Sequence, residues 1–284
     1  MRSLVRAVAA VALAGAACVM TPTANAAGVF GGGSSACSYT TINGHMYRCT
    51  FDDEFSTSRL DTTKWAVNPN LPTGDPNGLH ACSLNDPRFV NVSGGALHLT
   101  VGTVSTPVSC GGWSPTNIIA PTVSTYHLFS QQYGRFEARI RVPVVNQPGL
   151  GETFWMWPDD RYSTINWPAS GEMDVAQLFS SDPLNSYPFL HYGTDSWIAG
   201  TTIQQCAAAR GVWNTYDLDW TATSITVSIN GTTCMVNTSA DPAFQKRYIM
   251  ALSEAIDGGS NAPSSSFPYP ATMDVDYVRV WQAM

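Results

Sequence analysis

The sequence predicts an all-β protein, and three observations support this prediction. Short runs rich in Val, Ile, Thr and aromatic residues recur between clusters of Gly, Pro, Asn and Asp, which is typical of strands and turns. The segment 135–142 alternates charged and apolar residues with the two-residue period of a half-buried strand. After the first 26 residues, no stretch longer than one or two turns keeps a 3.6-residue period. We therefore expect little helix.

The first 26 residues have the pattern of a secretory signal peptide. Arg2 and Arg6 precede an apolar segment, and residues 24–26 (Ala-Asn-Ala) form a small-residue cleavage site. Cys18 raises the alternative of a lipoprotein, but the residues before it lack the large aliphatic side chain usual at such sites. The apolar run is also too short and too rich in alanine for a membrane span. We expect a secreted protein, extracellular or associated with the cell wall.

The composition of the chain limits its domain organisation and the classes of partner that it can bind. Residues 27–36 are rich in glycine and serine, which predicts a flexible leader, and residues 37–284 have the size of one β-sandwich domain. Charged residues make up 12% of the chain, and the net charge of −7 becomes more negative when the signal peptide is removed. The mature chain has no cluster of Lys and Arg, so nucleic acid and anionic membranes are poor partners. Such a surface suits a neutral ligand.

Six cysteines follow the signal peptide, and an even number in an exported chain argues for disulfides. Several pairings are possible. Proximity in sequence favours Cys37 with Cys49, Cys82 with Cys110, and Cys206 with Cys234. None of these cysteines lies in a C-x-x-C or Cys/His zinc pattern, so we expect no metal cluster from them.

In chain order, strands are predicted at 96–101, 134–142, 216–220, 224–229, 248–252 and 273–281. Asn230-Gly231, between 224–229 and 232–236, indicates a hairpin with a type I′ turn. Three segments are too long for hairpin loops, and we expect them to be irregular walls of a binding site: 68–87, 105–121 and 257–270.

The segment 171–180 places polar residues inside an apolar, strand-like run. Glu172 and Asp174 point to one face of an extended strand, whereas Gln177, five positions after Glu172, would point to the other. A β-bulge between Asp174 and Gln177 adds one residue and brings all three side chains to one face. We predict that this row is the active site. The alternatives are solvent-facing carboxylates on an amphipathic strand and a structural amide at Gln177.

Six motifs in sequence order resemble a known family. They are Phe51-Asp52-Asp53-Glu54-Phe55, Tyr133-Gly134-Arg135-Phe136-Glu137, Phe154-Trp155-Met156, Trp167-Pro168 before Gly171-Glu172-Met173-Asp174, His191-Tyr192-Gly193, and Asp276-Tyr277-Val278-Arg279-Val280. Together they resemble glycoside hydrolase family 16, the laminarinase-like β-glucanases, over nearly the whole mature chain. The resemblance implies a concanavalin A-like β-jelly-roll sandwich of two antiparallel sheets, with a sugar cleft on the concave face.

The resemblance also implies catalytic roles. Glu172 is the nucleophile, Asp174 orients and tunes it, and Gln177 stands where the family has an acid/base Glu. Retaining hydrolysis needs a second carboxyl group to protonate the leaving oxygen and then deprotonate water. An amide cannot do this, so a loss of about 10²- to 10⁴-fold in rate is expected. Glu152 or another carboxylate in the cleft is one conceivable replacement.

Four further residues are candidates for substrate binding. Trp155 and Trp167 match sugar-stacking tryptophans of the family, and stacking of a pyranose face on an aromatic ring is physically sound. His191 matches a histidine close to the acid/base position. Arg135 could reach the cleft or pair across strands. For the tryptophans and His191, the alternative is a structural role.

A calcium site on the convex face is the last implication of the resemblance. Asp276, with backbone oxygens near Glu54 and Gly94, matches the site that many family members carry, and the alternative is an ordinary strand Asp. This calcium would be structural, and we expect no cofactor in catalysis.

The function implied is a secreted, monomeric, endo-acting β-glucan hydrolase with a retaining mechanism. We expect β-1,3 linkages, because the longer bulged motif is similar to that of laminarinases. Two alternatives stay open: a non-catalytic β-glucan-binding protein on the same scaffold, and a transglycosylase or galactan-active relative.

Overall fold

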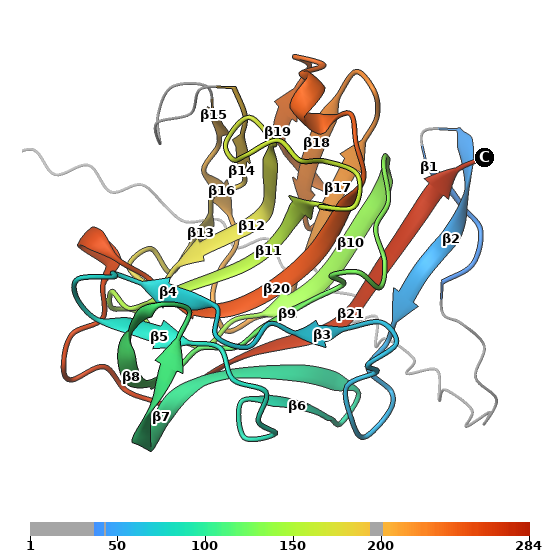
Figure 1. Ribbon diagram of the computed structural model, residues 1–284. Helices are drawn as coiled ribbons and strands as arrows, with labels where there is room; N and C mark the ends of the chain where they lie inside the picture. Colours follow the sequence, from blue (N-terminus) through green and yellow to red (C-terminus); the bar gives the residue numbers. More distant parts are fainter. Residues whose placement is uncertain (1–36, 43, 194–200) are drawn as a thin grey trace, which may run out of the picture. The chain divides into compact units, whose positions relative to one another are not determined.

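Two β-sheets make up most of the computed structural model, which describes residues 37–284 except 43 and 194–200 (Figure 1). The predicted signal peptide and leader lie outside the described residues. Among the described residues, the helical elements are two short 3-10 helices, η1 (Pro242–Phe244) and η2 (Gly259–Asn261). The all-β prediction is therefore confirmed. None of the described helices is long and apolar enough to span a membrane.

The first sheet has twelve strands. They are β1 (Thr40–Ile42), β2 (His45–Asp53), β4 (Pro72–Gly74), β5 (His80–Cys82), β6 (Val90–Ser93), β7 (Ala96–Cys110), β8 (Trp113–Ile119), β10 (Gly134–Arg141), β17 (Asn214–Trp220), β18 (Ile225–Ile229), β19 (Thr232–Asn237) and β21 (Ala271–Ala283). Among the described strands of this sheet, β5 and β8 form the single parallel pair.

The second sheet has nine strands. They are β3 (Ala66–Val67), β9 (Thr122–Ser124), β11 (Leu150–Pro158), β12 (Glu172–Phe179), β13 (Asn185–Ser186), β14 (Phe189–His191), β15 (Thr201–Ile203), β16 (Cys206–Ala207) and β20 (Tyr248–Ile256). Their main path runs β15-β14-β12-β11-β20-β9-β3, which puts β12 and β11 near the middle.

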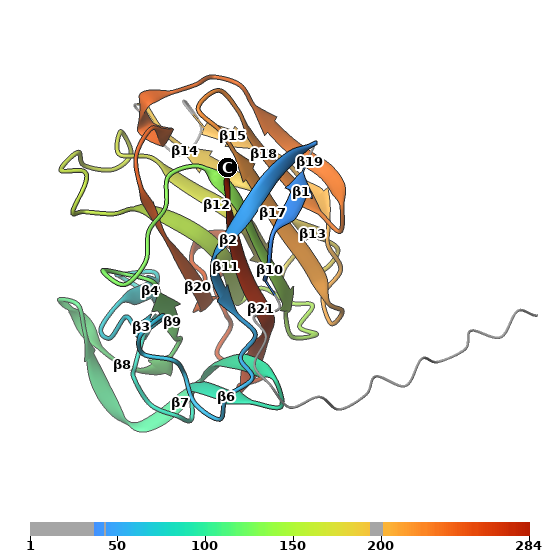
Figure 2. The same ribbon diagram turned by 90° about the vertical axis from the view of Figure 1, so that its right-hand side faces the viewer.

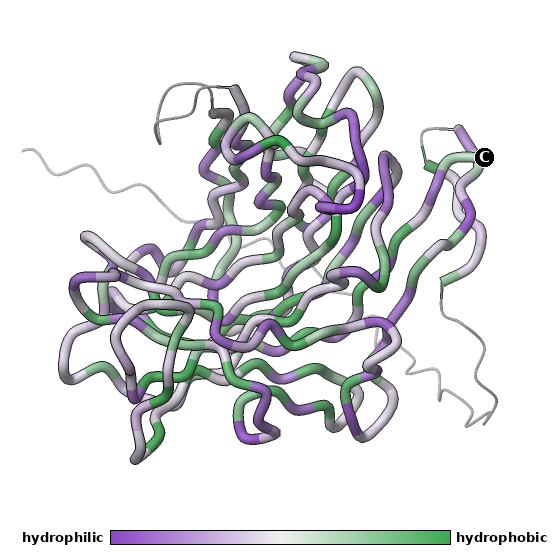
Figure 3. Tube along the Cα trace, viewed as in Figure 1, coloured by the Kyte–Doolittle hydropathy of each residue, from purple (hydrophilic) through white to green (hydrophobic). Residues whose placement is uncertain are grey.

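The two sheets pack face to face over one large apolar core. Phe136 and Ile140 of β10 meet Phe154 and Met156 of β11 in this core. Figure 2 shows β11, β12 and β20 on one side of the sandwich and β10, β17 and β21 on the other. The alternation of apolar and polar residues along the strands (Figure 3) gives each sheet one face for the core and one for solvent.

Local sequence signals predict several details correctly. Each of the six predicted strands lies on a strand of the structure, although β7 and β20 extend further than predicted. Asn230 and Gly231 both have positive φ, 51° and 76°, and join β18 to β19 as the I′ hairpin prediction requires. All three predicted disulfides are present, with Cα–Cα distances of 5.6, 5.4 and 5.8 Å.

The prediction of irregular structure over 105–121 is wrong. Strand β7 continues to Cys110, and its chain returns as β8 from Trp113. Gly111 and Gly112, with φ values of 52° and 88°, make the tight turn between them. A two-residue glycine turn between β-forming runs accounts for the hairpin. The segment 68–87 also contains short strands, β4 and β5, whereas 257–270 is irregular apart from η2.

Candidate active site

Strand β12 contains the predicted β-bulge. Phe154 of β11 lies opposite Ala176, and the next residue, Trp155, lies opposite Asp174. Val175 is therefore the extra residue on β12, because it has no partner on β11. The bulge lies between Asp174 and position 177, where the spacing of the polar residues requires it.

The bulge brings three polar side chains of β12 to one surface. Glu172, Asp174 and Gln177 all line a cleft of about 400 Å³ on the outer face of the nine-stranded sheet. Val175 and Ala176 both point into the core. Without the bulge, residue 177 would face the core and not the cleft. The predicted row on one face is therefore present.

Neighbouring strands complete the cleft. Its lining includes Thr153 and Trp155 of β11, Ser253 of β20 and His191 of β14. Two of the three predicted wall segments contribute to it: residues 71–74 come from 68–87, and Asp257 comes from 257–270. The lining contains no residue of 105–121.

Glu172 is oriented by a tryptophan. The Trp167 indole Nε1 donates a hydrogen bond of 2.8 Å to Glu172 Oε2. Trp167 is 38% exposed and lines the cleft, so its ring holds the carboxylate and also offers an apolar face to a ligand. A fixed carboxylate at the mouth of the cleft suits a nucleophile.

Asp174 is buried beside His191. The His191 Nε2 lies 3.4 Å from Asp174 Oδ2, and the imidazole stacks on Phe189 with ring centres 4.5 Å apart. Burial raises the pKa of Asp174, and the hydrogen bond with His191 opposes this rise. The proton affinity of the Asp174 carboxyl group therefore depends on its contact with His191.

The same residues form a potential metal site. Glu172, Asp174 and His191 each offer one ligand atom, and these atoms lie within 4.8 Å of one another. Two carboxylates and an imidazole are a donor set that zinc accepts. The sequence reasoning did not predict a metal here, because the three residues come from two strands that pair only in the folded protein.

Trp155 forms part of the cleft floor. Its Nε1 donates a hydrogen bond of 3.0 Å to Ser253 Oγ, which also accepts one of 2.9 Å from Thr122. Trp157, two residues further along β11, packs edge-on against it with ring centres 6.0 Å apart. These contacts hold the Trp155 ring in place at the surface of the cleft, as sugar stacking requires.

Gln177 lies at the position where the family resemblance expects an acid. It is half-buried and lies opposite Thr153. The described residues contain one carboxylate on the cleft besides Glu172 and Asp174, namely Asp257. Besides the two acids of β12, Asp257 is therefore the one carboxylate among the described cleft residues that could replace the missing acid.

The suggestion that Glu152 replaces the missing acid is wrong. Its neighbours Gly151 and Thr153 line the cleft, so strand alternation turns Glu152 to the opposite face, where it is fully buried. There it accepts two hydrogen bonds from Arg210, one of 2.8 Å from Nη1 and a second from Nη2. A substrate in the cleft cannot reach it.

Arg135 does not reach the cleft either. It lies on β10, in the other sheet, and its neighbour Phe136 points into the core. Arg135 therefore points to the outer face of the twelve-stranded sheet, where its Nη2 lies 2.9 Å from Asp217. Of the two roles considered for this residue, pairing across strands is the one present. The prediction that Arg135 binds substrate in the cleft is wrong.

The predicted calcium ligands are Asp276 and backbone oxygens near Glu54 and Gly94, and the side chains of the two acids take part in ion pairs. Both oxygens of Glu54 accept hydrogen bonds from Arg279, at 2.7 and 2.9 Å. Asp276 pairs with Arg139 at 2.6 Å, and Gly94 lies in the turn between β6 and β7. A calcium ion on Asp276 would share this carboxylate with Arg139 or displace it. Structural calcium stays a prediction.

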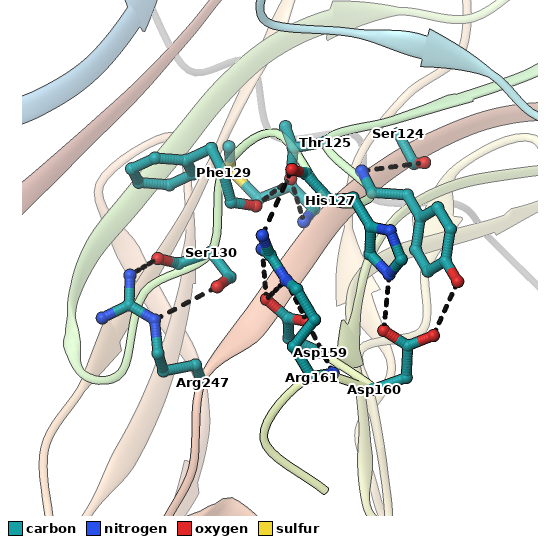
Figure 4. Close-up of polar contacts among 11 residues, drawn as sticks. Ser124, Thr125, His127, Phe129, Ser130, Asp159, Asp160, Arg161 and Arg247 are labelled. Atoms are coloured by element: carbon teal, nitrogen blue, oxygen red, sulfur yellow. Dashed lines mark hydrogen bonds and ion pairs between the residues drawn. The ribbon is translucent and has the colours of Figure 1, made fainter.

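A second cluster of metal-type ligands lies where β11 ends. Atoms of His127, Asp159 and Asp160 lie within 4.8 Å of one another. Figure 4 shows that both acids already have partners: Asp160 accepts hydrogen bonds from Tyr126 and His127, and Asp159 from Arg161. Burial raises the pKa of Asp159, but the bonds from Arg161 outweigh it and lower the pKa to about 2. The sequence reasoning did not predict this cluster.

Comparison with known protein families identifies this arrangement. The family described as glycosyl hydrolases family 16 matches residues 91–279. The chain belongs to glycoside hydrolase family 16. The family resemblance seen in the sequence is thus confirmed, and so is the jelly-roll fold.

The relatives of this family 16 chain include enzymes that are named for different polysaccharides. Glucan endo-1,3-beta-glucosidase A1 of Niallia circulans is 26% identical over 82% of the chain and 37% of that protein. Keratan-sulfate endo-1,4-beta-galactosidase of Sphingobacterium multivorum is 25% identical over 86% of the chain and 57% of that protein. The chain therefore spans between a third and three fifths of the length of these relatives.

Solved structures show the same fold. A non-specific endo-beta-1,3(4)-glucanase of family 16, crystallised with an oligosaccharide, aligns with a TM-score of 0.73 and 25% identity over 88% of this chain and 100% of the other. The endo-beta-1,3-glucanase of Pyrococcus furiosus aligns with a TM-score of 0.73 and 20% identity over 87% of this chain and 98% of the other. The second likeness supports the fold alone.

Proposed function

We propose that this chain is a secreted, retaining glycoside hydrolase that cuts within β-1,3-glucan chains. The observation that carries the proposal is the row of Glu172, Asp174 and Gln177 on the cleft face of β12, with Trp167 bonded to Glu172. The names of several relatives, which are glucan endo-1,3-β-glucosidases or endo-1,3-1,4-β-glycanases, support a glucan substrate.

In the proposed mechanism, a glucan lies across β12 and β11 with sugar rings on Trp155 and Trp167. The Glu172 carboxylate attacks the anomeric carbon and forms a glycosyl-enzyme. Asp174, held against His191, adjusts the charge and hydrogen bonding of Glu172. Gln177 can donate an amide hydrogen bond to the glycosidic oxygen but cannot transfer a proton to it. The poorly assisted step is therefore departure of the leaving sugar.

The test compares two substrates that differ in their need for an acid. The dinitrophenolate group of a dinitrophenyl β-laminaribioside can leave without protonation. The leaving sugar of laminarin needs a proton. Wild type is expected to release dinitrophenol, to cleave laminarin slowly, and to gain about 10²- to 10⁴-fold on laminarin with Gln177→Glu. Glu172→Gln should abolish both reactions. Added azide should attack the glycosyl-enzyme and give a β-glycosyl azide, the product of a retaining pathway.

The proposed function is wrong if wild type acts on none of these substrates, whether or not Gln177→Glu does. The second candidate, a non-catalytic β-glucan-binding protein, is favoured by the amide at Gln177. It predicts retardation of the wild-type protein on a gel that contains laminarin, together with no turnover of either substrate. The hypothesis that the chain is a galactan-active enzyme predicts activity on a galactan and none on laminarin.

Secretion is part of the proposal and rests on the signal-peptide pattern of residues 1–26 and on the three disulfides, which suit an oxidising compartment. N-terminal sequencing of protein from a culture supernatant would test the cleavage after Ala26. Light scattering would test the proposed monomer. Activity measured with and without EDTA would separate the acid–base proposal from metal chemistry at Glu172, Asp174 and His191.

A further inference from the structure

A second cavity adjoins the candidate active site at the ends of β12 and β20. It has a volume of about 510 Å³ and shares Gly74, Phe179 and Asp257 with the lining of the cleft. The rest of its lining comes from Ser181 and from residues 258–261, which include η2. In Figure 1, β4 and the segment after β20 lie at the same end of the sheet. A ligand in the cleft can therefore extend into this second cavity, which has the size of a small-molecule site.

The cavity wall is held rigidly by one buried amide. Asn261 Nδ2 donates hydrogen bonds of 2.9 Å to the Leu150 carbonyl and to Asp257 Oδ2. Its Oδ1 accepts one of 3.2 Å from the Ser181 backbone. Asp257 Oδ1 accepts a further bond of 2.7 Å from Gly258. These bonds tie η2 to β11 and to the end of β12, so the Asp257 carboxylate is positioned before a ligand arrives.

The chemistry of the lining matches a neutral sugar. Phe179 is half-buried and packs against Tyr187 with ring centres 5.5 Å apart, so it offers a fixed apolar face for pyranose C–H groups. The Asp257 oxygens each accept one bond within the protein and keep capacity for a sugar hydroxyl. Ser181 and Ser260 add exposed hydroxyl groups. One aromatic face with hydrogen-bonding groups beside it can orient a sugar ring.

The charge of the cavity lining disfavours binding of an anionic sugar. The residues that line the cavity include Asp257 and contain no Lys or Arg. A sulfate or uronate group would therefore approach a carboxylate without a compensating cation, which is unfavourable in a partly enclosed site. The cavity is expected to discriminate against sulfated galactan units.

We propose that this cavity is an additional subsite for a neutral hexose unit of the bound glucan, with Phe179 as the stacking face and Asp257 as the hydroxyl acceptor. The inference rests on the proposed β-glucan substrate and extends it. The hexose could come from continuation of the main chain or from a side branch. Both sources share the same chemistry, and the experiment below separates them.

The experiment measures binding by calorimetry in a Glu172→Gln background, which prevents turnover. The probes are linear β-1,3-gluco-oligosaccharides of three to eight units and the same oligosaccharides with a single β-1,6-linked glucosyl branch. Asp257→Ala should raise the Kd of the probes that reach the cavity by about 10-fold, as expected for loss of a hydrogen bond to a charged group. The trisaccharide is too short to fill both sites, and it should bind the Ser260→Trp variant described below as tightly as it binds the parent, because Ser260 lines the second cavity and not the cleft.

Two further variants test whether a weaker binding by Asp257→Ala comes from the cavity and not from misfolding. Ser260→Trp fills the cavity from an exposed position and should weaken the same probes. Asp86→Asn removes a partly exposed carboxylate that pairs with Arg88 outside both cavities, and it should leave the binding of every probe unchanged. A gain in affinity with linear length assigns the subsite to the main chain, whereas a gain only with the branch assigns it to a side chain.

The assignment is overturned if Asp257→Ala and Ser260→Trp bind every probe as tightly as the parent while the trisaccharide still binds. Failure of the parent to bind any probe would instead refute the proposed β-glucan substrate, and the subsite with it.

Discussion

Arg210 neutralises the acids buried between the two sheets, and its removal tests this electrostatic arrangement. The side chains of Arg210 and Glu152 are 2% and 0% exposed. Glu254 lies directly opposite Glu152 on the neighbouring strand β20, and neither of its carboxylate oxygens has a hydrogen-bond partner among the described residues. Burial, and then the charge of Glu152, raise the pKa of Glu254 well above its usual value. Arg210 is the cation that offsets this excess of acids.

Arg210→Met keeps much of the volume of the side chain and removes its charge and hydrogen bonds. The variant leaves Glu152 buried without a partner, a change that typically costs about 3 to 5 kcal/mol. The bond from Arg210 Nε to the Pro143 carbonyl, 2.9 Å long, is lost as well. For a domain of this size, such a loss lowers the melting temperature by roughly 6 to 20 °C.

The assay is urea and thermal unfolding followed by circular dichroism at pH 5 and pH 8. The double variant Arg210→Met with Glu152→Gln serves as the control, and it should recover at least half of the lost stability. If the free energy of unfolding of Arg210→Met at pH 8 lies within about 1 kcal/mol of the wild-type value, the ion pair does not stabilise the fold.

Three other predictions follow from named contacts. Burial, and then the hydrogen bond with Glu137, raise the pKa of Asp217 from 3.8 to about 7, so the folded state loses stability as the pH rises from about 4 to 7. Asp217→Asn should therefore gain stability over wild type above pH 7, and equal pH profiles in urea unfolding would contradict this. Trp155→Ala should weaken laminarin binding about 10-fold on an affinity gel; unchanged mobility would argue against stacking. His191→Ala should lower kcat on a dinitrophenyl glycoside about 10-fold with little change in KM, whereas a change in KM alone would contradict tuning through Asp174.

Several features could be predicted from the sequence because they depend on residues close together in the chain. The spacing of Glu172, Asp174 and Gln177 requires one extra residue, and the structure has that residue at Val175. Asn230-Gly231 specifies a turn because both positions need positive φ. The disulfides join neighbouring cysteines, so sequence proximity was sufficient to predict them.

Other features could not be predicted, because a two-residue period shows which side chains share a face but not where that face points. Arg135 stands in an alternating strand, but pairing of β10 with β17 and β21 puts it in the sheet that does not carry the cleft. Glu152 is next to two cleft residues, yet it points to the core because alternation turns it over. The orientation of each strand depends on partners far away in sequence.

The sequence by itself thus determined the family, the all-β class and the content of the catalytic strand, including the amide at Gln177. Only the tertiary structure decided which carboxylates share the cleft. Glu152 faces away from it, and its buried carboxylate pairs with Arg210, which lies 58 residues away in sequence. Asp257 is brought to it by the end of β20, and Asn261 fixes it there. The reason is that a side chain's electrostatic surroundings are set by contacts between strands, and local sequence does not encode these contacts.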